Sequence, residues 1–492
     1  MTRQRRLKRR VAHALRTAVR RAGGRRKTLR EVASLAWPIA AAMAGETLLG
    51  LVDTKLVGGL GPKALGGVAV AMMIVFLLYT IVFGLMRGMK VCVAHAVGEG
   101  RAYQSVRYAQ ASIGLGLFAG IVFAACTRDV GPLFTWLGID ASLVGPARAF
   151  LAAFTFGAPG TAVVCALTHH RQAEGDSRTP MVVGLSGNVF NGLLGWSLIY
   201  GHLGLPALGV RGSAYATATT EWLEAFVLLA LLLRDVRRRG GYERARAELP
   251  LRNATREVLS LGLPTAMQFA SETLAFATFT TILGTLGAEQ IAAHQIALAV
   301  IRTSFLPGMA FGEAASVLVG QALGRRSVAQ ADRATRAALL LATGFMSACG
   351  VVFAVGGGLI ARAFTSDETV AHVARNLLWI AAGFQVLDAA NLVLRGALRG
   401  AKDVRVPMAL GIGIVWTCIP SAALVLGRWA GWGTVGGWCG FVLETTLSAA
   451  LFSMRWKRGP WRRAYASTAS PLVTDTFRPG TDPTAAAGSL HR

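Results

Sequence analysis

A long-period internal repeat is the feature that most constrains how this chain folds. The pattern Arg-Glu-Val-x-Ser-Leu-x-x-Pro begins at Arg30 and returns 226 positions later at Arg256. The triplet Glu-Thr-Leu at Glu46 returns at Glu272 with the same offset. A further pattern, Asp-x-Arg-x-Pro-Met at Asp176, returns after 227 positions, so one residue has been added between the motifs. Such a duplication predicts two structurally equivalent halves.

The composition places both halves in a membrane. The chain is 53% hydrophobic and only 15% charged, and its apolar segments approach the roughly 20 residues that span a bilayer as a helix. The 58 glycines favour close packing of helices in lipid. We therefore predict an all-α polytopic membrane protein with twelve spans, six in each copy. The spans cover about residues 33–56, 64–86, 108–126, 146–168, 181–200, 212–233, 258–283, 290–312, 336–360, 372–394, 408–427 and 433–454.

An even number of spans in each copy means that both copies enter the membrane from the same side. The two lobes should then be related by a pseudo-two-fold axis along the membrane normal, with a cavity between them. We expect five parts along the chain. They are a basic cytoplasmic tail (1–30), an N-lobe (31–233), a cytoplasmic linker (234–256), a C-lobe (257–454) and a disordered cytoplasmic tail (455–492).

The basic residues that give the chain its net charge of +26 lie mainly in the predicted loops and tails. Most lysines and arginines fall on one side if the amino terminus is cytoplasmic, which is the positive-inside pattern of a plasma-membrane protein with both termini inside. The first thirty residues contain no acidic side chain, and we expect them to lie on anionic lipid headgroups, with a regulatory or partner-binding role as the alternative. The arginines that follow spans two and eight are interpreted as orientation charges: Arg87, Arg101, Arg325 and Arg326.

Several classes of function lack a sequence signature. The six cysteines show no Cys-x-x-Cys spacing, which predicts neither a disulfide framework nor a structural metal. No nucleophile–base pair or phosphate-binding loop is evident, so we do not expect an enzyme or a cofactor. We expect a monomer whose partners are small-molecule substrates and membrane lipids, without nucleic acid.

Carboxylates inside the predicted spans carry the strongest functional signal, because an ionisable group at bilayer depth faces the bundle interior and usually acts there. Glu46 and Asp53 lie two helical turns apart on one face of span one, and Glu272 and Asp388 lie in spans seven and ten. Three further acids, in spans six and twelve, could instead be paired with bases or lie at an interface: Glu221, Glu224 and Glu444. The bases expected within the membrane are few, chiefly Lys55, Arg148 and Arg302.

An apolar environment favours the neutral form of a carboxyl group, whereas a nearby cation favours the charged form. A site of this kind can exchange a proton for a cationic substrate, which is the coupling step of an antiporter. Pro38 and Pro264 each lie early in the first span of a copy and permit a helix kink. A bend upstream of Asp53 could couple protonation to the shape of the cavity; a static packing kink is an equal alternative.

Three stretches, 50–54, 292–298 and 396–403, make the chain resemble the multidrug and toxic compound extrusion (MATE) family of efflux transporters. The resemblance implies a two-lobed exporter of twelve helices that trades sodium or protons for amphipathic, often cationic compounds. Asp53 is similar to the family's cation-coupling aspartate, and Glu272 and Asp388 to the acidic pair of the second lobe. Asn191 and Thr217 are similar to the residues that join the aspartate, which implies a possible Na⁺ site at these three positions.

The chain departs from the family pattern at two positions. Gly195 stands where many relatives with a first-lobe cation site carry an aspartate, and Glu46 stands where a glutamine is more usual. Whether Glu46 supplies the missing charge stays open. Our leading hypothesis is an antiporter that exports small organic compounds in exchange for H⁺ or Na⁺. The alternatives are a flippase for lipid-linked precursors or oligosaccharides and, less compatible with the duplication, an ion channel or membrane scaffold.

Overall fold

The computed structural model describes residues 2–136 and 138–466. Helices dominate, and no strand occurs among these residues. The first half contains α1 (Thr2–Gly58), α2 (Pro62–Gly98), η1 (Ala102–Gln104), α3 (Ser105–Cys126), α4 (Gly131–Trp136), α5 (Ala141–Phe154), α6 (Ala158–Glu174), α7 (Arg178–Tyr200) and α8 (Val210–Arg239). The second half contains α10 (Leu251–Gly284), α11 (Ala288–Gly324), α12 (Val328–Phe364), α13 (Glu368–Gly400), α14 (Arg405–Ala422), η2 (Ala423–Trp429), α15 (Gly433–Arg458) and α16 (Pro460–Ala466).

The all-α polytopic fold is confirmed, although the count of twelve apolar spans is not reached. Within the described residues, 10 helices are long and apolar enough to cross a membrane, or 11 if α5 and α6, bent by 55°, form one broken span. Helix α10 contains the predicted seventh span but is not among them. Its sequence explains this, because Gln268, Ser271, Glu272 and several threonines interrupt the apolar segment and lower its mean hydropathy.

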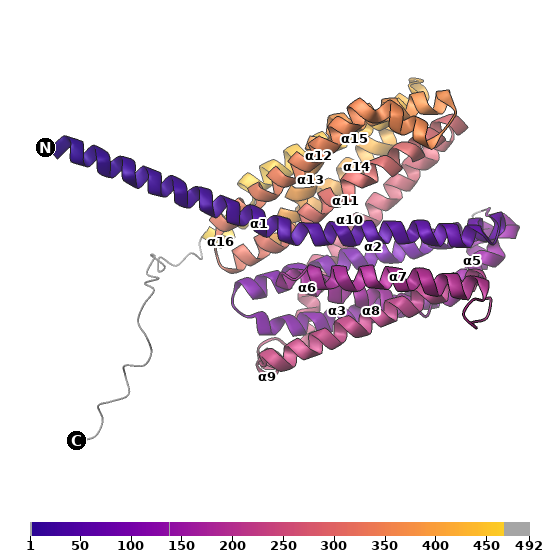
Figure 1. Ribbon diagram of the computed structural model, residues 1–492, viewed down its shortest axis with the longest axis horizontal. Coiled ribbons are helices and arrows are strands. Elements are labelled where there is room, and N and C mark those ends of the chain that lie inside the picture. The colour runs from indigo at the N-terminus through magenta and orange to yellow at the C-terminus, as the bar shows by residue number, and fades with distance from the viewer. Residues whose placement is uncertain (1, 137, 467–492) are drawn as a thin grey trace, which may run out of the picture.

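The helices form two bundles, the N-lobe (α1–α8) and the C-lobe (α10–α16), which lie together at the end where α1 enters the bundle and α16 lies, and diverge toward the other end (Figure 1). Small residues bring α2 of the N-lobe against α10 of the C-lobe. Gly84 faces Ala266, and a Cβ at Gly88 would overlap the backbone of Gly262. The absence of side chains at such points allows helix backbones to approach closely.

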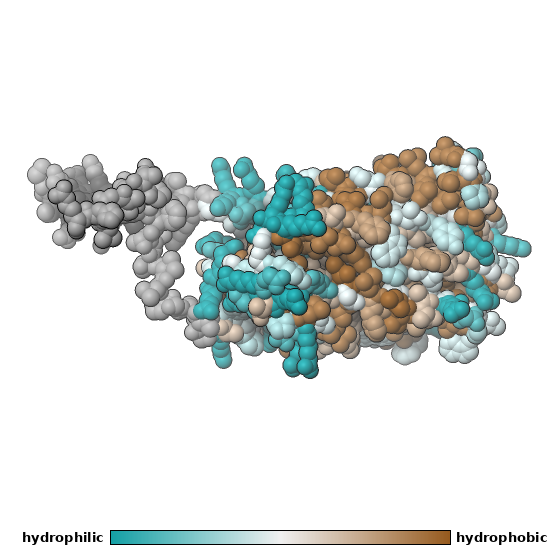
Figure 2. Space-filling model, turned by 90° about the horizontal axis from the view of Figure 1, so that it is seen from below, coloured by the Kyte–Doolittle hydropathy of each residue, from teal (hydrophilic) through white to brown (hydrophobic). Residues whose placement is uncertain are grey.

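An apolar band covers the middle of the molecule on the face that is drawn in Figure 2. Figure 2 shows this band in brown, with hydrophilic residues gathered at the two ends of the molecule. Large apolar side chains are exposed along it, among them Phe118, Val355 and Leu359. A continuous exposed apolar surface of this kind is what lipid requires of a spanning bundle.

Three helices extend beyond the spans predicted from hydropathy. Helix α2 continues to Gly98 rather than ending near residue 86, α11 continues to Gly324, and α13 continues to Gly400. The interpretation of Arg87 as a loop charge that sets orientation is therefore wrong, because its side chain lies inside α2 and is 2% exposed. A buried base persists there because it has an acidic partner, Glu313 of α11.

The linker between the lobes is ordered against the N-lobe. It contains α9 (Tyr242–Glu248), and its backbone at Leu249 accepts a hydrogen bond of 3.0 Å from Arg107 Nε. The hydroxyl of Tyr103 donates to Glu248, and together with Arg244 it lowers the pKa of that carboxyl to about 2. Glu248 therefore stays ionised, and the linker is held by charge-assisted hydrogen bonds.

The predicted disordered tail begins too early in the sequence. Residues 455–458 and 460–466 are helical, and Arg462 of α16 forms a bidentate ion pair with Asp332 of α12. The rest of that prediction, residues 467–492, lies outside the described part of the chain. Toward the other terminus, residues 2–30 of the predicted basic tail form the first part of α1, and residue 1 lies outside the described part of the chain.

Candidate functional site

An arginine bridges two carboxylates inside the C-lobe. Arg395 Nη1 of α13 lies 2.6 Å from Glu272 Oε1 of α10, and Arg395 Nη2 lies 4.0 Å from Glu444 Oε1 of α15. Gln268 Nε2 also donates to Glu272 at 2.9 Å. The three charged side chains are at most 14% exposed. The predicted acid Glu272 is therefore paired with a base that hydropathy had placed in a loop.

Asp388 lies two turns before Arg395 in the same helix. It is 8% exposed, and it makes no hydrogen bond or ion pair within the described residues. Its charge interacts with Glu444 and Arg395 from a longer distance. The structure thus places Glu272 and Asp388 in one polar region of the C-lobe but does not join them directly.

The predicted first-lobe residues lie on three helices. Asn191 of α7 is 2% exposed and donates through Nδ2 to Thr217 Oγ1 of α8 at 3.4 Å, while Asn191 Oδ1 has no hydrogen-bond partner. Asp53 of α1 is half-buried and makes no hydrogen bond or ion pair with either residue. A Cβ at Gly195 would lie 3.9 Å from Asn191 Oδ1 and would make only ordinary contacts there. A sodium site at Asp53, Asn191 and Thr217 stays a prediction.

The two prolines lie at matching places in the two lobes. Pro38 is within α1 and Pro264 is within α10, and each helix continues through its proline as one element. Each proline removes one backbone hydrogen bond from its helix. A functional bend at either position stays a prediction.

The most extensively paired charged side chains lie where the lobes meet: Arg87, Lys90, Glu313 and Arg399. Together with Gln172, which is hydrogen-bonded to Lys90, we call them the inter-lobe ion cluster. Glu313 of the C-lobe lies 2.6 Å from Arg87 Nη2 and 2.7 Å from Lys90 Nζ, both of the N-lobe. Lys90 Nζ also donates to Gln172 at 2.7 Å, and Arg399 Nη2 lies 3.5 Å from Glu313. One carboxylate thus pairs with three buried cations, two of which lie across the boundary.

Aromatic rings offset part of this excess positive charge. The guanidinium carbon of Arg87 lies 4.4 Å from the ring centre of Phe83 and 4.2 Å from that of Phe269, which belongs to the other lobe. Cation–π contacts of this kind are strongest when the cation is desolvated. Arg87 is therefore held to the C-lobe both by an ion pair and by an aromatic ring.

Sequence reasoning missed this cluster, although the repeat contains a signal for it. Arg87 and Glu313 are separated by 226 positions, and Gln172 and Arg399 by 227, so each pair occupies equivalent places in the two halves. In a two-fold arrangement, equivalent residues near the axis face one another. Opposite charges at such a pair of positions could have predicted contact between them.

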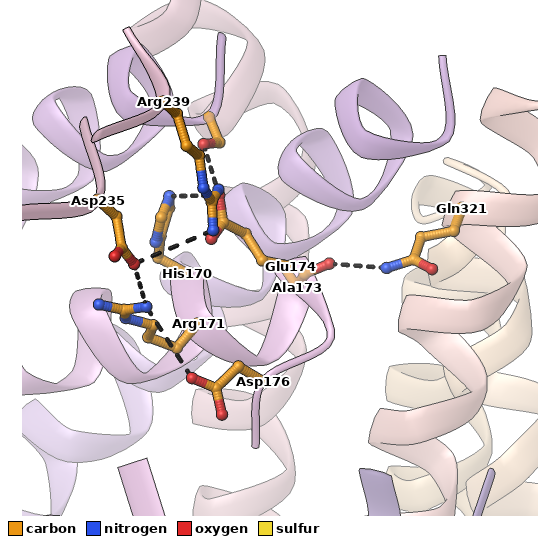
Figure 3. A network of polar contacts seen from close by, with 9 residues as sticks. His170, Arg171, Ala173, Glu174, Asp176, Asp235, Arg239 and Gln321 are labelled. Atoms are coloured by element: carbon orange, nitrogen blue, oxygen red, sulfur yellow. Dashed lines mark hydrogen bonds and ion pairs between the residues drawn. The ribbon is translucent and has the colours of Figure 1, made fainter. Parts of the chain in front are cut away.

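A second polar network closes the same end of the N-lobe (Figure 3). Arg171 of α6 lies 2.6 Å from Asp235 of α8, and Arg239 lies 3.0 Å from Glu174. Gln321 of the C-lobe donates to the backbone oxygen of Ala173 at 3.1 Å. The ends of α6 and α8 are therefore tied together, and α11 is tied to them.

The fold and these sites define a class: a two-lobed, helical membrane transporter with charged residues buried in each lobe. The family model described as MatE matches residues 38–197 and 264–449. A probable multidrug resistance protein NorM of Burkholderia pseudomallei is 33% identical over 438 residues, which cover 87% of this chain and 92% of the relative. One from Thermotoga maritima is 26% identical over 436 residues, covering 88% and 93%.

Solved structures share the same fold. The eukaryotic MATE transporter AtDTX14 aligns with a TM-score of 0.78 at 19% identity and covers 90% of this chain and 98% of its own. The outward-facing conformation of a multidrug resistance MATE family transporter aligns with a TM-score of 0.79 at 21% identity, covering 90% and 97%. The chain belongs to the MATE family of multidrug efflux transporters, which confirms the resemblance.

Proposed function

We propose that the protein is a secondary active antiporter of the plasma membrane with both termini in the cytoplasm. It exports small amphipathic, cationic organic compounds in exchange for H⁺ or Na⁺ by alternating access. One observation carries the proposal: each lobe holds an aspartate within a spanning helix that makes no ion pair among the described residues, Asp53 in α1 and Asp388 in α13. The names of the NorM relatives support drugs as substrates.

An unpaired carboxylate at bilayer depth suits a coupling site. It binds a proton or a sodium ion and becomes electrically neutral, and an arriving organic cation favours the release of that ion. Glu272 differs, because Arg395 already balances its charge at 2.6 Å. In this proposal Glu272 and Arg395 position the C-lobe site, and Asp388 exchanges the ion.

The inter-lobe ion cluster belongs to the same proposal. Alternating access requires the lobes to separate at the end where they now lie together, where Arg87 and Lys90 contact Glu313. Separation breaks these contacts, so the cluster favours the arrangement in which this end is closed. The ion and the substrate must therefore bind the separated arrangement of the lobes with a different affinity from the closed one, and this difference drives the lobes apart.

Substitution of the two aspartates tests the proposal. Asp53→Asn and Asp388→Asn each keep the side-chain volume but remove the exchangeable charge, so each should abolish drug resistance in a sensitised host. Glu289→Gln, in the exposed first turn of α11, is the matched control and should retain resistance. Membrane levels are compared by immunoblotting. Full resistance in both aspartate variants at normal levels would refute these coupling sites.

A further inference from the structure

Two hydrogen bonds cross the boundary between the lobes in opposite directions. His95 Nε2 of α2 donates to the backbone oxygen of Gly400 in α13 at 2.8 Å. Gln321 Nε2 of α11 donates to the backbone oxygen of Ala173 in α6 at 3.1 Å, as Figure 3 shows. Each lobe thus supplies one side-chain donor and one backbone acceptor. We call these two hydrogen bonds the reciprocal latch.

The internal repeat relates one bond of the latch to the other. Gln321 lies 226 positions after His95, and Gly400 lies 227 positions after Ala173. These are the offsets of the repeat motifs, so the two donors are equivalent residues of the two lobes, and so are the two acceptors. A two-fold axis produces each contact of an interface twice in this way. The latch therefore belongs to the symmetric interface between the lobes, although its donors differ in type.

Both acceptors lie at the carboxyl ends of helices, where backbone oxygens lack a partner within the helix. Helix α6 ends at Glu174 and α13 ends at Gly400. Among the described residues, neither the oxygen of Ala173 nor that of Gly400 accepts a backbone hydrogen bond. Each oxygen is therefore satisfied by a side chain of the other lobe while the lobes are together. When the lobes separate, water can take the place of that side chain.

Two glycines bring the donors to these positions. A Cβ at Gly324 of α11 would overlap the backbone oxygen of His95, and a Cβ at Gly98 of α2 would overlap that of Gln321. The two glycines are themselves 226 positions apart and hence equivalent. Because they lack side chains, the ends of α2 and α11 approach closely enough for each donor to reach the other lobe. His95 is 3% exposed, so water does not compete for its hydrogen bond in this arrangement.

We propose that His95 and Gln321 are positioning residues for alternating access: the reciprocal latch holds the lobes closed at this end and is released when they separate. The inference rests on the proposed function and adds to it the two residues that set the balance between closed and open lobes. A hydrogen bond to an uncharged backbone oxygen changes an equilibrium by about two- to tenfold. Two such bonds favour the closed arrangement, yet the binding of an ion and a substrate can overcome them.

Spin-label distances in the full-length protein in lipid nanodiscs test the latch. Labels are attached at Arg178→Cys and Arg405→Cys, two exposed, equivalent positions at the starts of α7 and α14, after the six native cysteines are replaced by alanine. With the latch intact and no ligand, the short distance of the closed arrangement should predominate. His95→Leu and Gln321→Leu should each raise the ratio of separated to closed lobes about fivefold. Each change removes a donor and leaves a backbone oxygen unpaired only while the lobes are closed.

Two further variants separate the latch from a general effect of substitution. His95→Gln places at 95 the residue found at the equivalent position, so the ratio should stay within about twofold of the parent. Gln104→Leu is the matched control, because Gln104 Nε2 donates at 3.0 Å to Glu248 of the linker and not to the C-lobe. It should leave the ratio unchanged. If His95 and Gln321 served stability alone, the leucine variants would lower the thermal midpoint and leave the ratio of the two distances as it was.

Unchanged ratios in both leucine variants would overturn the inference. A ratio for His95→Gln equal to that for His95→Leu would also overturn it, and so would the absence of the closed arrangement from the parent. Monodisperse elution identifies folded variants, and alanine replaces leucine at a position where the leucine variant does not fold. The proposed function fails separately, by absence of ion-driven export. Distances that depend on His95 and Gln321 would support the latch in that case too.

Discussion

At the scale of single residues, the buried charges separate into two kinds. Glu313 is surrounded by Arg87, Lys90 and Arg399 at 2.6 to 3.5 Å, so its charge is fully engaged in holding the lobes. Asp53 and Asp388 have no such partner in the described residues. Paired groups are expected to serve structure and conformational state, whereas unpaired groups are available to bind a mobile ion.

Glu313→Gln should destabilise the protein far more than Arg399→Gln. The first change leaves three buried cations without an anion, and removing one partner of a buried pair costs about 3–5 kcal/mol. The second change removes one of the mutually repelling cations and places at 399 the residue found at the equivalent position, Gln172. We expect its effect to stay within about 1 kcal/mol. Denaturation midpoints in detergent measure both, and equal losses would contradict the assigned role of Glu313.

The candidate residues could be predicted by type, but their partners could not. Acids in apolar segments indicated Glu272 and Asp388 directly. Arg395, however, follows the apolar segment, and hydropathy assigns such a charge to a loop. Its partner Glu272 lies 123 positions away, so only the folded lobe shows that the charge is buried. Repeat offsets, applied to charged residues, would have found Arg87 and Glu313.

At the scale of helices, small residues determine where the lobes touch. Gly88 of α2 lies against the backbone of Gly262 in α10, which leaves no room for a side chain. Hydropathy located nearly every span, because apolar runs of bilayer length are a local signal. It misplaced the ends of α2, α11 and α13, since those ends contain charges that are buried only through contacts between helices.

Gly88→Val should weaken the contact between α2 and α10. The added carbons must displace the α10 backbone, and overpacking of this kind costs about 1–3 kcal/mol. Gly114→Val in α3 is the matched control, because nothing lies within 4 Å of a Cβ at that position. Thermal midpoints of the two variants give the comparison. A Gly88→Val midpoint no lower than that of Gly114→Val would show that this contact tolerates a side chain.

At the scale of the whole molecule, the duplication gives the two lobes equivalent positions. The residues at which the lobes differ give the lobes different roles. Equivalent positions meet at the boundary as Arg87 with Glu313. A second pair of equivalent residues contacts the same cluster, since Gln172 accepts a hydrogen bond from Lys90 and Arg399 pairs with Glu313. Away from the boundary, the C-lobe carries its own guanidinium whereas the N-lobe carries unpaired carboxylates. In the C-lobe the guanidinium of Arg395 already balances Glu272, so Asp388 is the carboxylate that we expect to exchange an ion there.

Transport into inverted membrane vesicles tests the central claim most directly. A pH gradient and a sodium gradient are imposed separately, and the accumulation of a cationic dye is followed by fluorescence. We predict accumulation that requires at least one of the two gradients, saturates with dye concentration and is lost in Asp53→Asn. Dye movement that is the same with and without both gradients, or the same in Asp53→Asn as in wild type, would contradict an ion-coupled exporter.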